Sequence, residues 1–225
     1  MRQLWCAVAI AAILALTVTG CTKAITGVAQ PDPRKPGTAL TSDGYGIVAG
    51  FPDAPVQLEL FTEPQCNHCA GFQATYGEDI KHHIETGQLV VTYRPLTFLD
   101  DEFNIDYSAK AANTLFLAAG SGTSAAIFQT FVEQLWANQD LSHDYYSNSD
   151  FADLARDSGV AGDIVDRIGS GDSGVNTTEM NAVNTDSLAQ ISRGNIATPT
   201  LYNLKTKAVV DISERDWLNK VLDGS

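Results

Sequence analysis

The residues best suited to chemistry are two cysteines, Cys66 and Cys69, with Asn67 and His68 between them. Behind this motif an apolar side chain recurs every four residues, at Phe72, Tyr76, Ile80 and Ile84. The spacing predicts an amphipathic helix from the motif to about Thr86, which places Cys66 at the helix N-terminus. Unpaired backbone N–H groups and the helix dipole favour a thiolate there. A fall of about two units from the usual pKa of about 8.5 makes most of the thiol nucleophilic near neutral pH.

The position of each sulfur predicts its role in thiol-disulfide exchange. Cys66 is expected to be the exposed nucleophile, and Cys69, one turn further into the helix, the resolving or leaving thiol. A protonated His68 would place a cation beside the sulfur. Because a stabilised thiolate stabilises the reduced dithiol, His68 favours an oxidising pair. The sulfurs themselves carry the redox equivalents, so we expect no cofactor.

A Cys pair at this spacing also fits half of a structural zinc site or a plain structural disulfide. Structural zinc needs four ligands, and the chain offers no second Cys pair, only His82, His83 and His143 to assist. A disulfide that closes so small a loop constrains the unfolded chain little. A redox pair is therefore the preferred interpretation, and we expect no metal site.

Strand-like runs rich in β-branched and aromatic residues flank the predicted helix, at Val56–Phe61 and Gln88–Arg94. A right-handed crossover makes these two strands parallel, so they form a βαβ unit with the helix. The pattern is then helical between about residues 104 and 193, with breaks at glycines. The helices predicted there are 107–119, 124–138, 150–158, 161–168 and 177–191.

The last part of the chain predicts an antiparallel hairpin and a helix. The hairpin strands are 200–203 and 208–212, joined by a polar turn. The helix begins near Ser213, with Glu214 and Asp216 in its first turn. The whole order, βαβ, helices and ββα, predicts an α/β fold.

This order resembles the thioredoxin fold, and the helical insertion at about 104–193 resembles the DsbA-like thiol-disulfide oxidoreductases in particular. The resemblance spans about Ala54 to Leu222 and implies a single domain over 54–225. It rests on the Cys66–Cys69 motif, on His68 within it, and on Ala197-Thr198-Pro199-Thr200 before the third strand. The resemblance implies that Thr198-Pro199 is the cis-proline turn of the family. Thr198 and Pro199 would then bind an extended substrate segment beside the disulfide.

The chain departs from the family at two positions. Asn67 replaces the proline often found after the first cysteine, which affects the oxidising strength. Many relatives carry a buried acid six residues before the first cysteine, where this chain has Leu60. Two other residues could supply an acid that handles the proton of Cys69. One is Glu59, whose side chain points to the opposite face of the strand from that of Leu60. The other is Glu63, in the loop before Cys66.

The N-terminus predicts export and lipidation. Arg2 and the apolar run from Leu4 to Val18 are typical of an export signal and are too short for a comfortable bilayer span. The run ends in Val18-Thr19-Gly20-Cys21, which resembles the lipobox of bacterial lipoproteins. It implies that residues 1–20 are a signal peptide and that Cys21 is lipidated, with an ordinary secretory signal or an uncleaved anchor as alternatives. Residues 21–53 contain several prolines and small residues and predict an extended tether.

Composition excludes several classes of protein. With 44% apolar and 18% charged residues, the chain is neither disordered, collagenous nor a multi-span membrane protein. Fourteen Lys and Arg against 27 Asp and Glu give a net charge of −13. Such an acidic surface repels the phosphate backbone, so we expect no nucleic-acid partner.

Together these features predict a monomeric oxidoreductase, lipid-anchored at the extracytoplasmic face of the cell membrane. It would introduce disulfides into exported proteins that carry Cys thiols, and a membrane oxidant would regenerate its disulfide. Two alternatives stay open. One is a disulfide isomerase or reductase that uses the same pair. The other is a metal-binding lipoprotein in which Cys66, Cys69 and His68 capture a soft cation, although Met180 is the only methionine after the signal.

Overall fold

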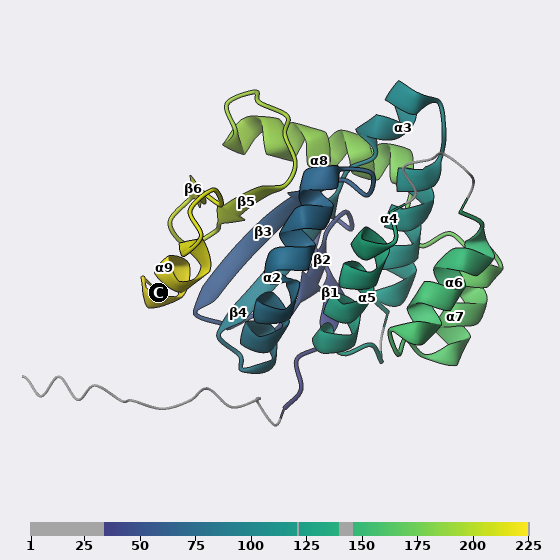
Figure 1. Cartoon of the computed structure of the whole chain (residues 1–225), viewed down its shortest axis with the longest axis horizontal. Coiled ribbons are helices and arrows are strands. Elements are labelled where there is room, and N and C mark those ends of the chain that lie inside the picture. Colours follow the sequence, from purple (N-terminus) through teal and green to yellow (C-terminus); the bar gives the residue numbers. More distant parts are fainter. Residues whose placement is uncertain (1–33, 121, 140–145, 225) are drawn as a thin grey trace, which may run out of the picture.

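A mixed six-stranded sheet forms the centre of the computed structural model, which describes residues 34–120, 122–139 and 146–224 (Figure 1). The strand order is β1-β2-β4-β3-β5-β6. The strands are β1 (Thr38–Leu40), β2 (Ile47–Ala49), β3 (Val56–Thr62), β4 (Leu89–Pro95), β5 (Thr200–Asn203) and β6 (Ala208–Val209). Only β3 and β4 pair in parallel; the other neighbouring strands are antiparallel.

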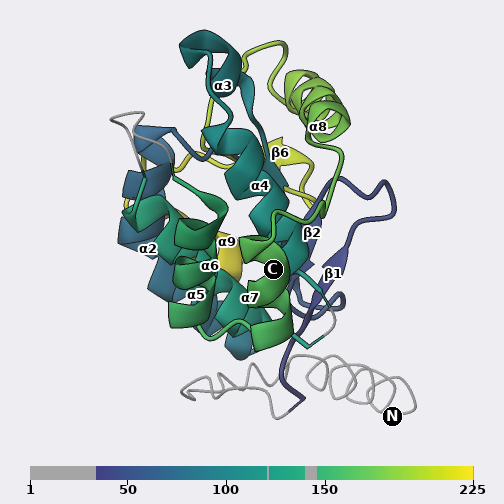
Figure 2. The same cartoon turned by 90° about the vertical axis from the view of Figure 1, so that its right-hand side faces the viewer.

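The βαβ unit is present as predicted. Helix α2 (Asn67–Glu85) joins β3 to β4 and begins one residue after Cys66. Every residue of β4 is buried, because helices cover the sheet and its neighbouring strands flank it. Helix α2 lies beside α5 (Ala125–Ala137) in both views, and their apolar side chains fill the space in front of the sheet (Figures 1 and 2).

In the described part of the helical insertion, the structure contains the five predicted helices and one more. They are α4 (Tyr107–Ala118), α5, α6 (Asn148–Asp157), α7 (Gly162–Gly169) and α8 (Thr177–Ile191). The additional helix, α3 (Phe98–Phe103), starts the insertion earlier than residue 104. Six residues are too few to show a helical period, so no local pattern predicts this helix. Helices α3 and α8 lie at the same end of the molecule (Figures 1 and 2).

The prediction of an extended tether over residues 21–53 is wrong for its last part, residues 38–49, which contain two strands. Strand β1 pairs with β2, and β2 pairs with β4, so this segment belongs to the sheet. Ile47 and Ala49 are fully buried. Each strand is three residues long, which is too short for an alternation of polar and apolar residues to stand out in the sequence. The predicted signal peptide (1–20), Cys21 and the tether up to residue 33 lie outside the described residues.

The last strand and the last helix are both shorter than predicted. Strand β6 ends at Val209, and α9 (Trp217–Asp223) begins at Trp217, because residues 212–216 form turns. Trp217 is 1% exposed and packs against Phe72 and Tyr76 of α2, with ring centroids 5.8 and 5.3 Å away. Within the three described ranges, no helix is long and apolar enough to cross a lipid bilayer.

Candidate active site

Cys66 lies where α2 meets the turn before β5. It is the N-cap residue of the helix, with an extended backbone, and it is partly exposed. The Thr198–Pro199 peptide bond is cis, as the resemblance implied. The Cys66 sulfur lies 3.2 Å from the carbonyl oxygen of Thr198, to which its protonated form donates a hydrogen bond. The structure therefore brings together the cysteine motif and the proline turn, although 132 residues separate Cys66 from Thr198.

The surroundings of Cys66 lower its pKa from 9.0 to about 5. The largest contribution is a hydrogen bond that the Cys69 thiol donates to the Cys66 sulfur. Burial acts in the opposite direction, but the side chain of Thr198 and the backbone N–H groups of Cys69 and His68 lower the pKa further. Both N–H groups lie in the first turn of α2, where the positive end of the helix dipole favours an anion. Cys66 is thus a thiolate at neutral pH.

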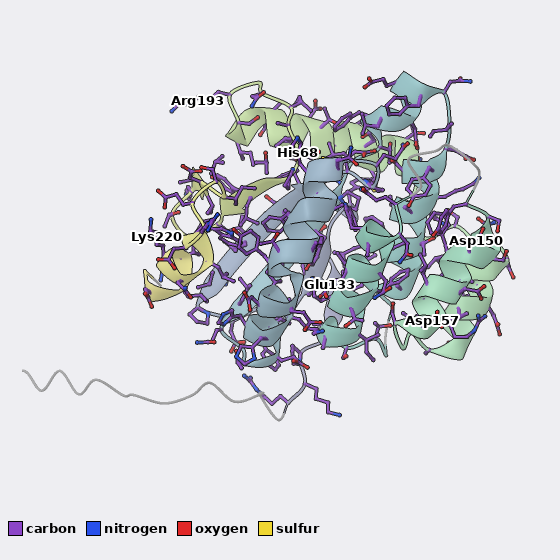
Figure 3. All side chains as sticks on the ribbon, viewed as in Figure 1. His68, Glu133, Asp150, Asp157, Arg193 and Lys220 are labelled. Atoms are coloured by element: carbon purple, nitrogen blue, oxygen red, sulfur yellow. The ribbon has the colours of Figure 1, made fainter. Side chains whose placement is uncertain are left out.

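His68 acts on Cys66 through its backbone. Its side chain is exposed at the N-terminal end of α2 (Figure 3), and the group of His68 that lowers the pKa of Cys66 is the N–H. The sequence predicted that the helix N-terminus and a protonated imidazole together hold the thiolate. The groups that lower the pKa of Cys66 include the N–H groups at the helix N-terminus and the second thiol, whose contribution the sequence did not predict.

Cys69 is 1% exposed, and its pKa is raised well above 9.0. Burial is the main cause, followed by the hydrogen bond to Cys66 and the negative charge of Cys66. The backbone of Glu63 and the side chain of Thr62 oppose this effect by hydrogen bonding to the sulfur. The two thiols therefore differ strongly in acidity, with Cys66 ionised and Cys69 protonated at neutral pH.

Glu63 is the acid next to the two cysteines. It is completely buried, and burial is the main reason that its pKa is raised to about 8; the charge of Cys66 also contributes. Glu59 instead binds Arg94 at 2.8 Å in an ion pair away from the motif. The sequence could not choose between the two carboxyl groups. Because Glu63 follows the last residue of β3, its burial depends on contacts with distant segments that no local pattern reveals.

A groove of about 520 Å³ adjoins the Cys66 sulfur. One wall is the start of α2 with Gln65, and the facing wall is the loop before β5, with Ile196, Ala197 and Thr198. Helix α3 supplies Phe98, Leu99 and Phe103. Phe103 and Ile196 are 44% and 38% exposed, so the groove presents apolar surface to solvent. The sequence did not predict α3, and so it did not predict the part of the groove that α3 forms.

Gln139, which the sequence also missed, holds the backbone of the motif from the helical insertion. Its side-chain amide donates hydrogen bonds to the carbonyl oxygens of Pro64 at 2.7 Å and Cys66 at 3.0 Å. These bonds join the chain after α5 to the loop that leads into α2. A lone glutamine after a helix carries no sequence signal for this contact.

Two of the three histidines that could have completed a zinc site do not lie near the cysteines. His82 and His83 are in the last turn of α2, at the opposite end from Cys66. His143 lies outside the described residues. In the part of the chain that the structure covers, no group of three or more His, Cys, Asp or Glu residues is placed to hold a metal ion.

Comparison with solved structures supports the fold. The chain is 21% identical to the MdbA protein, a thiol-disulfide oxidoreductase from Corynebacterium diphtheriae, with a TM-score of 0.68 over 82% of this chain and 92% of that chain. Reduced DsbA from Mycobacterium tuberculosis is 21% identical, with a TM-score of 0.59 over 84% of this chain and 91% of that one. At these identities the likeness establishes the fold.

Sequence comparison extends to much longer proteins. The chain is 26% identical over 182 residues to the serine/threonine-protein kinase PknE of Mycobacterium tuberculosis, which covers 79% of this chain and 31% of the kinase. The chain thus spans less than a third of the length of that relative. The family model described as thioredoxin matches residues 42–221, a range that includes β2, the Cys pair, the cis-proline turn and most of α9. With the DsbA-like insertion between its two halves, the chain belongs to the thioredoxin family.

Proposed function

We propose that the chain is a protein thiol-disulfide oxidoreductase that forms disulfides in other proteins through Cys66 and Cys69. The observation that carries the proposal is the pair of unequal thiols beside the cis-proline turn. Cys66 is partly exposed with a pKa of about 5, and Cys69 is buried with a pKa above the usual value. MdbA and DsbA, which share the fold, support this assignment.

The low pKa of Cys66 favours oxidation of substrates over reduction. At pH 7 a thiol with a pKa of about 5 is almost fully ionised, whereas a thiol with a pKa of 9.0 is about 1% ionised. The difference stabilises the reduced pair by about 2.7 kcal/mol, which is a factor of about 100 in the equilibrium with a substrate dithiol. A disulfide whose reduced form is stabilised in this way readily accepts electrons.

The proposed reaction has two exchange steps. A substrate thiolate attacks the Cys66 sulfur of the disulfide, and the Cys69 sulfur leaves and takes up a proton, which Glu63 can supply. A second substrate thiolate then attacks the substrate sulfur of the mixed disulfide and releases Cys66 as a stable thiolate. Two substrate thiols are oxidised to one disulfide, and the Cys66–Cys69 pair is reduced by two electrons. His68 assists the second step through its backbone N–H, which stabilises the Cys66 thiolate.

The substrate segment around the attacking cysteine would lie in the groove. Thr198 and Pro199 form the edge of the proline turn beside the Cys66 sulfur, so we assign them to substrate binding. We propose that an extended segment runs along the groove, between α3 and the loop before β5. The exposed apolar side chains favour unfolded substrates, in which apolar residues are accessible.

We further propose that the protein works as a lipid-anchored monomer at the extracytoplasmic face of the cell membrane. Support comes from the predicted export signal and from the lipobox-like residues that end at Cys21. Its substrates would be exported proteins, and a membrane oxidant would regenerate the disulfide. Replacing Cys21 by serine should move the protein from the membrane fraction to the soluble exported fraction. An unchanged distribution would reject lipidation at Cys21.

The redox function can be tested with a reduced, unfolded protein that regains activity when its disulfides form. The oxidised wild-type protein should speed this recovery, and Cys66→Ser should abolish the effect. Cys69→Ser keeps Cys66 as a thiolate, and when it is offered a protein disulfide it should attack that disulfide and accumulate as the mixed disulfide, because no second thiol resolves it. Full activity of Cys66→Ser would reject the mechanism.

A titration against glutathione separates the oxidase from the other activities of the same pair. A reduction potential near the roughly −120 mV of strong oxidants supports an oxidase, and one near the roughly −270 mV of thioredoxin supports a reductase. Stoichiometric bound metal in the purified protein, without thiol cycling, would replace both with a metal-binding function.

A further inference from the structure

Two buried carboxyl groups lie close to the cysteines, and the proposed reaction uses only one of them. Glu63 is in the loop before α2, and Asp100 is in α3. Gln65 and Ser108, the second residue of α4, lie between them. All four side chains are buried, with exposed fractions of 0% for Glu63, 4% for Gln65, 0% for Ser108 and 8% for Asp100.

Asp100 accepts three hydrogen bonds. The backbone N–H groups of Ser108 and Ala109, in the first turn of α4, donate to its two oxygens at 2.8 and 2.7 Å. The side-chain amide of Gln65 donates to the first of these oxygens at 2.9 Å. Two backbone donors at a helix N-terminus favour an anion, because they satisfy orphan N–H groups and face the helix dipole. These donors therefore favour the carboxylate form of Asp100, against burial, which raises its pKa.

Glu63 accepts two hydrogen bonds and is connected to Asp100. The backbone N–H of Gln65 donates to one oxygen at 2.6 Å, and the hydroxyl of Ser108 donates to the other. The Ser108 hydroxyl also accepts a bond from the Gln65 amide at 2.9 Å. A hydroxyl can both donate and accept, so Ser108 can bind Glu63 in its ionised and in its protonated form. Gln65 and Ser108 thus bridge the two carboxyl groups.

We propose that Asp100 is a positioning residue of the redox site, whose fixed negative charge makes Glu63 hold the proton that Cys69 needs. The inference rests on the proposed function, because only a reaction that releases Cys69 as a leaving thiolate needs such a proton. Asp100 touches neither sulfur and acts through Gln65, Ser108 and Glu63.

The physical basis is that two buried carboxyl groups in one cluster do not both ionise readily. Burial raises the pKa of each, and the charge of Asp100 is among the causes that raise the pKa of Glu63. The other charged group that acts on Glu63 is Cys66; those that act on Asp100 are Asp106, at the start of α4, and Asp101, on α3. Because Asp100 accepts three hydrogen bonds and Glu63 accepts two, the negative charge is more stable on Asp100, and Glu63 keeps the proton.

The test is a titration of the Glu63 carboxyl group in the full-length reduced protein by carbon-13 NMR. The signal is identified by its absence in Glu63→Gln. Asp100→Asn should lower its titration midpoint by about one pH unit, which is the smallest shift typical of a nearby like charge. Asp101→Asn, which removes an exposed charge one residue away, is the matched control and should shift the midpoint by less than half as much. An unchanged midpoint in Asp100→Asn, or an equal shift in the control, would overturn the inference.

A second variant covers the case in which Asp100→Asn does not fold, since Asp100 caps α4. Ser108→Ala removes a donor to ionised Glu63 and should move the midpoint upward, opposite to the effect of Asp100→Asn. No upward shift in Ser108→Ala would count against the inference. A merely structural role for either residue would not move the midpoint in opposite directions.

The proposed function is measured separately, as substrate oxidation by the wild-type protein. In Asp100→Asn the pH profile of mixed-disulfide formation should move to lower pH together with the Glu63 midpoint. Normal oxidation by the wild type with no shift in the variant would reject the role of Asp100 alone. Absence of oxidation by the wild type would reject the proposed function itself, and with it the purpose of the proton.

Discussion

The hydrogen bond from the Cys69 thiol to the Cys66 sulfur is the largest contribution to the low pKa of Cys66, and it can be removed selectively. Cys69→Ala takes away the donor, whereas Cys69→Ser keeps a hydroxyl in its place. A hydrogen bond to a charged group contributes about 1.5–3 kcal/mol, and one pKa unit corresponds to about 1.4 kcal/mol. Cys69→Ala should therefore raise the pKa of Cys66 by about 1–2 units, to between about 6 and 7, and Cys69→Ser by less than about one unit.

The assay is the rate of alkylation by iodoacetamide as a function of pH, because only the thiolate reacts. Mass spectrometry of the peptide that carries Cys66 separates its reaction from that of Cys6 and Cys21. The clearest comparison is near pH 5, where about half of wild-type Cys66 is ionised but only about 1–10% of Cys66 in Cys69→Ala. An alanine variant with the wild-type profile would refute the idea that the second thiol holds the first as an anion. Equal shifts in the alanine and serine variants would assign the effect to packing.

Three further outcomes follow from the same site. His68→Ala keeps the backbone N–H that acts on Cys66, so the pKa of Cys66 should change by less than about half a unit in the alkylation assay; an imidazole cation beside the sulfur would instead give a rise of about one unit or more. Gln139→Ala removes the amide that binds the carbonyl groups of Pro64 and Cys66, and it should slow substrate oxidation several-fold, whereas Asn138→Ala on the same loop should not. Glu63→Gln removes an acid whose pKa rises on folding from 4.5 to about 8. Because the folded state then binds more protons than the unfolded state between these pH values, this acid lowers stability as pH rises through that range. The variant should gain about 3–5 kcal/mol in urea unfolding of the reduced protein at pH 8 and little at pH 4.

The parts of the fold that the sequence predicted are those with a local period or a continuous apolar run. The spacing of Phe72, Tyr76, Ile80 and Ile84 is that of a helix face, and all but the partly buried Tyr76 are indeed buried on α2. The β-branched run of β4 is buried throughout. Such patterns arise because one element must hide one face, and they are readable without knowing what covers it.

Elements defined by distant partners could not be predicted in this way. Strand β2 has three residues, and its place in the sheet depends on pairing with β4 more than 40 positions later. Helix α3 has six residues, and its Asp100 binds the backbone at the start of α4. The choice between Glu59 and Glu63 needed the positions of Arg94 and Ser108, which lie 35 and 45 residues further along the chain.

The helical insertion supplies side chains that hold the redox site in place. The two thioredoxin halves supply both cysteines, Glu63 and the proline turn, but the side chains that bind Glu63 and the motif backbone from outside, Ser108 and Gln139, come from the insertion. The hydrogen bonds from Gln139 fix the backbone around Cys66. They therefore also fix the N–H groups that stabilise its thiolate, because those groups belong to the same backbone. The acidity of Cys66 and the proton on Glu63 therefore depend on the insertion as well as on the two residues between the cysteines. Exchanging α3 and α4 for those of another family member should change the reduction potential even when Cys66-Asn67-His68-Cys69 is left intact.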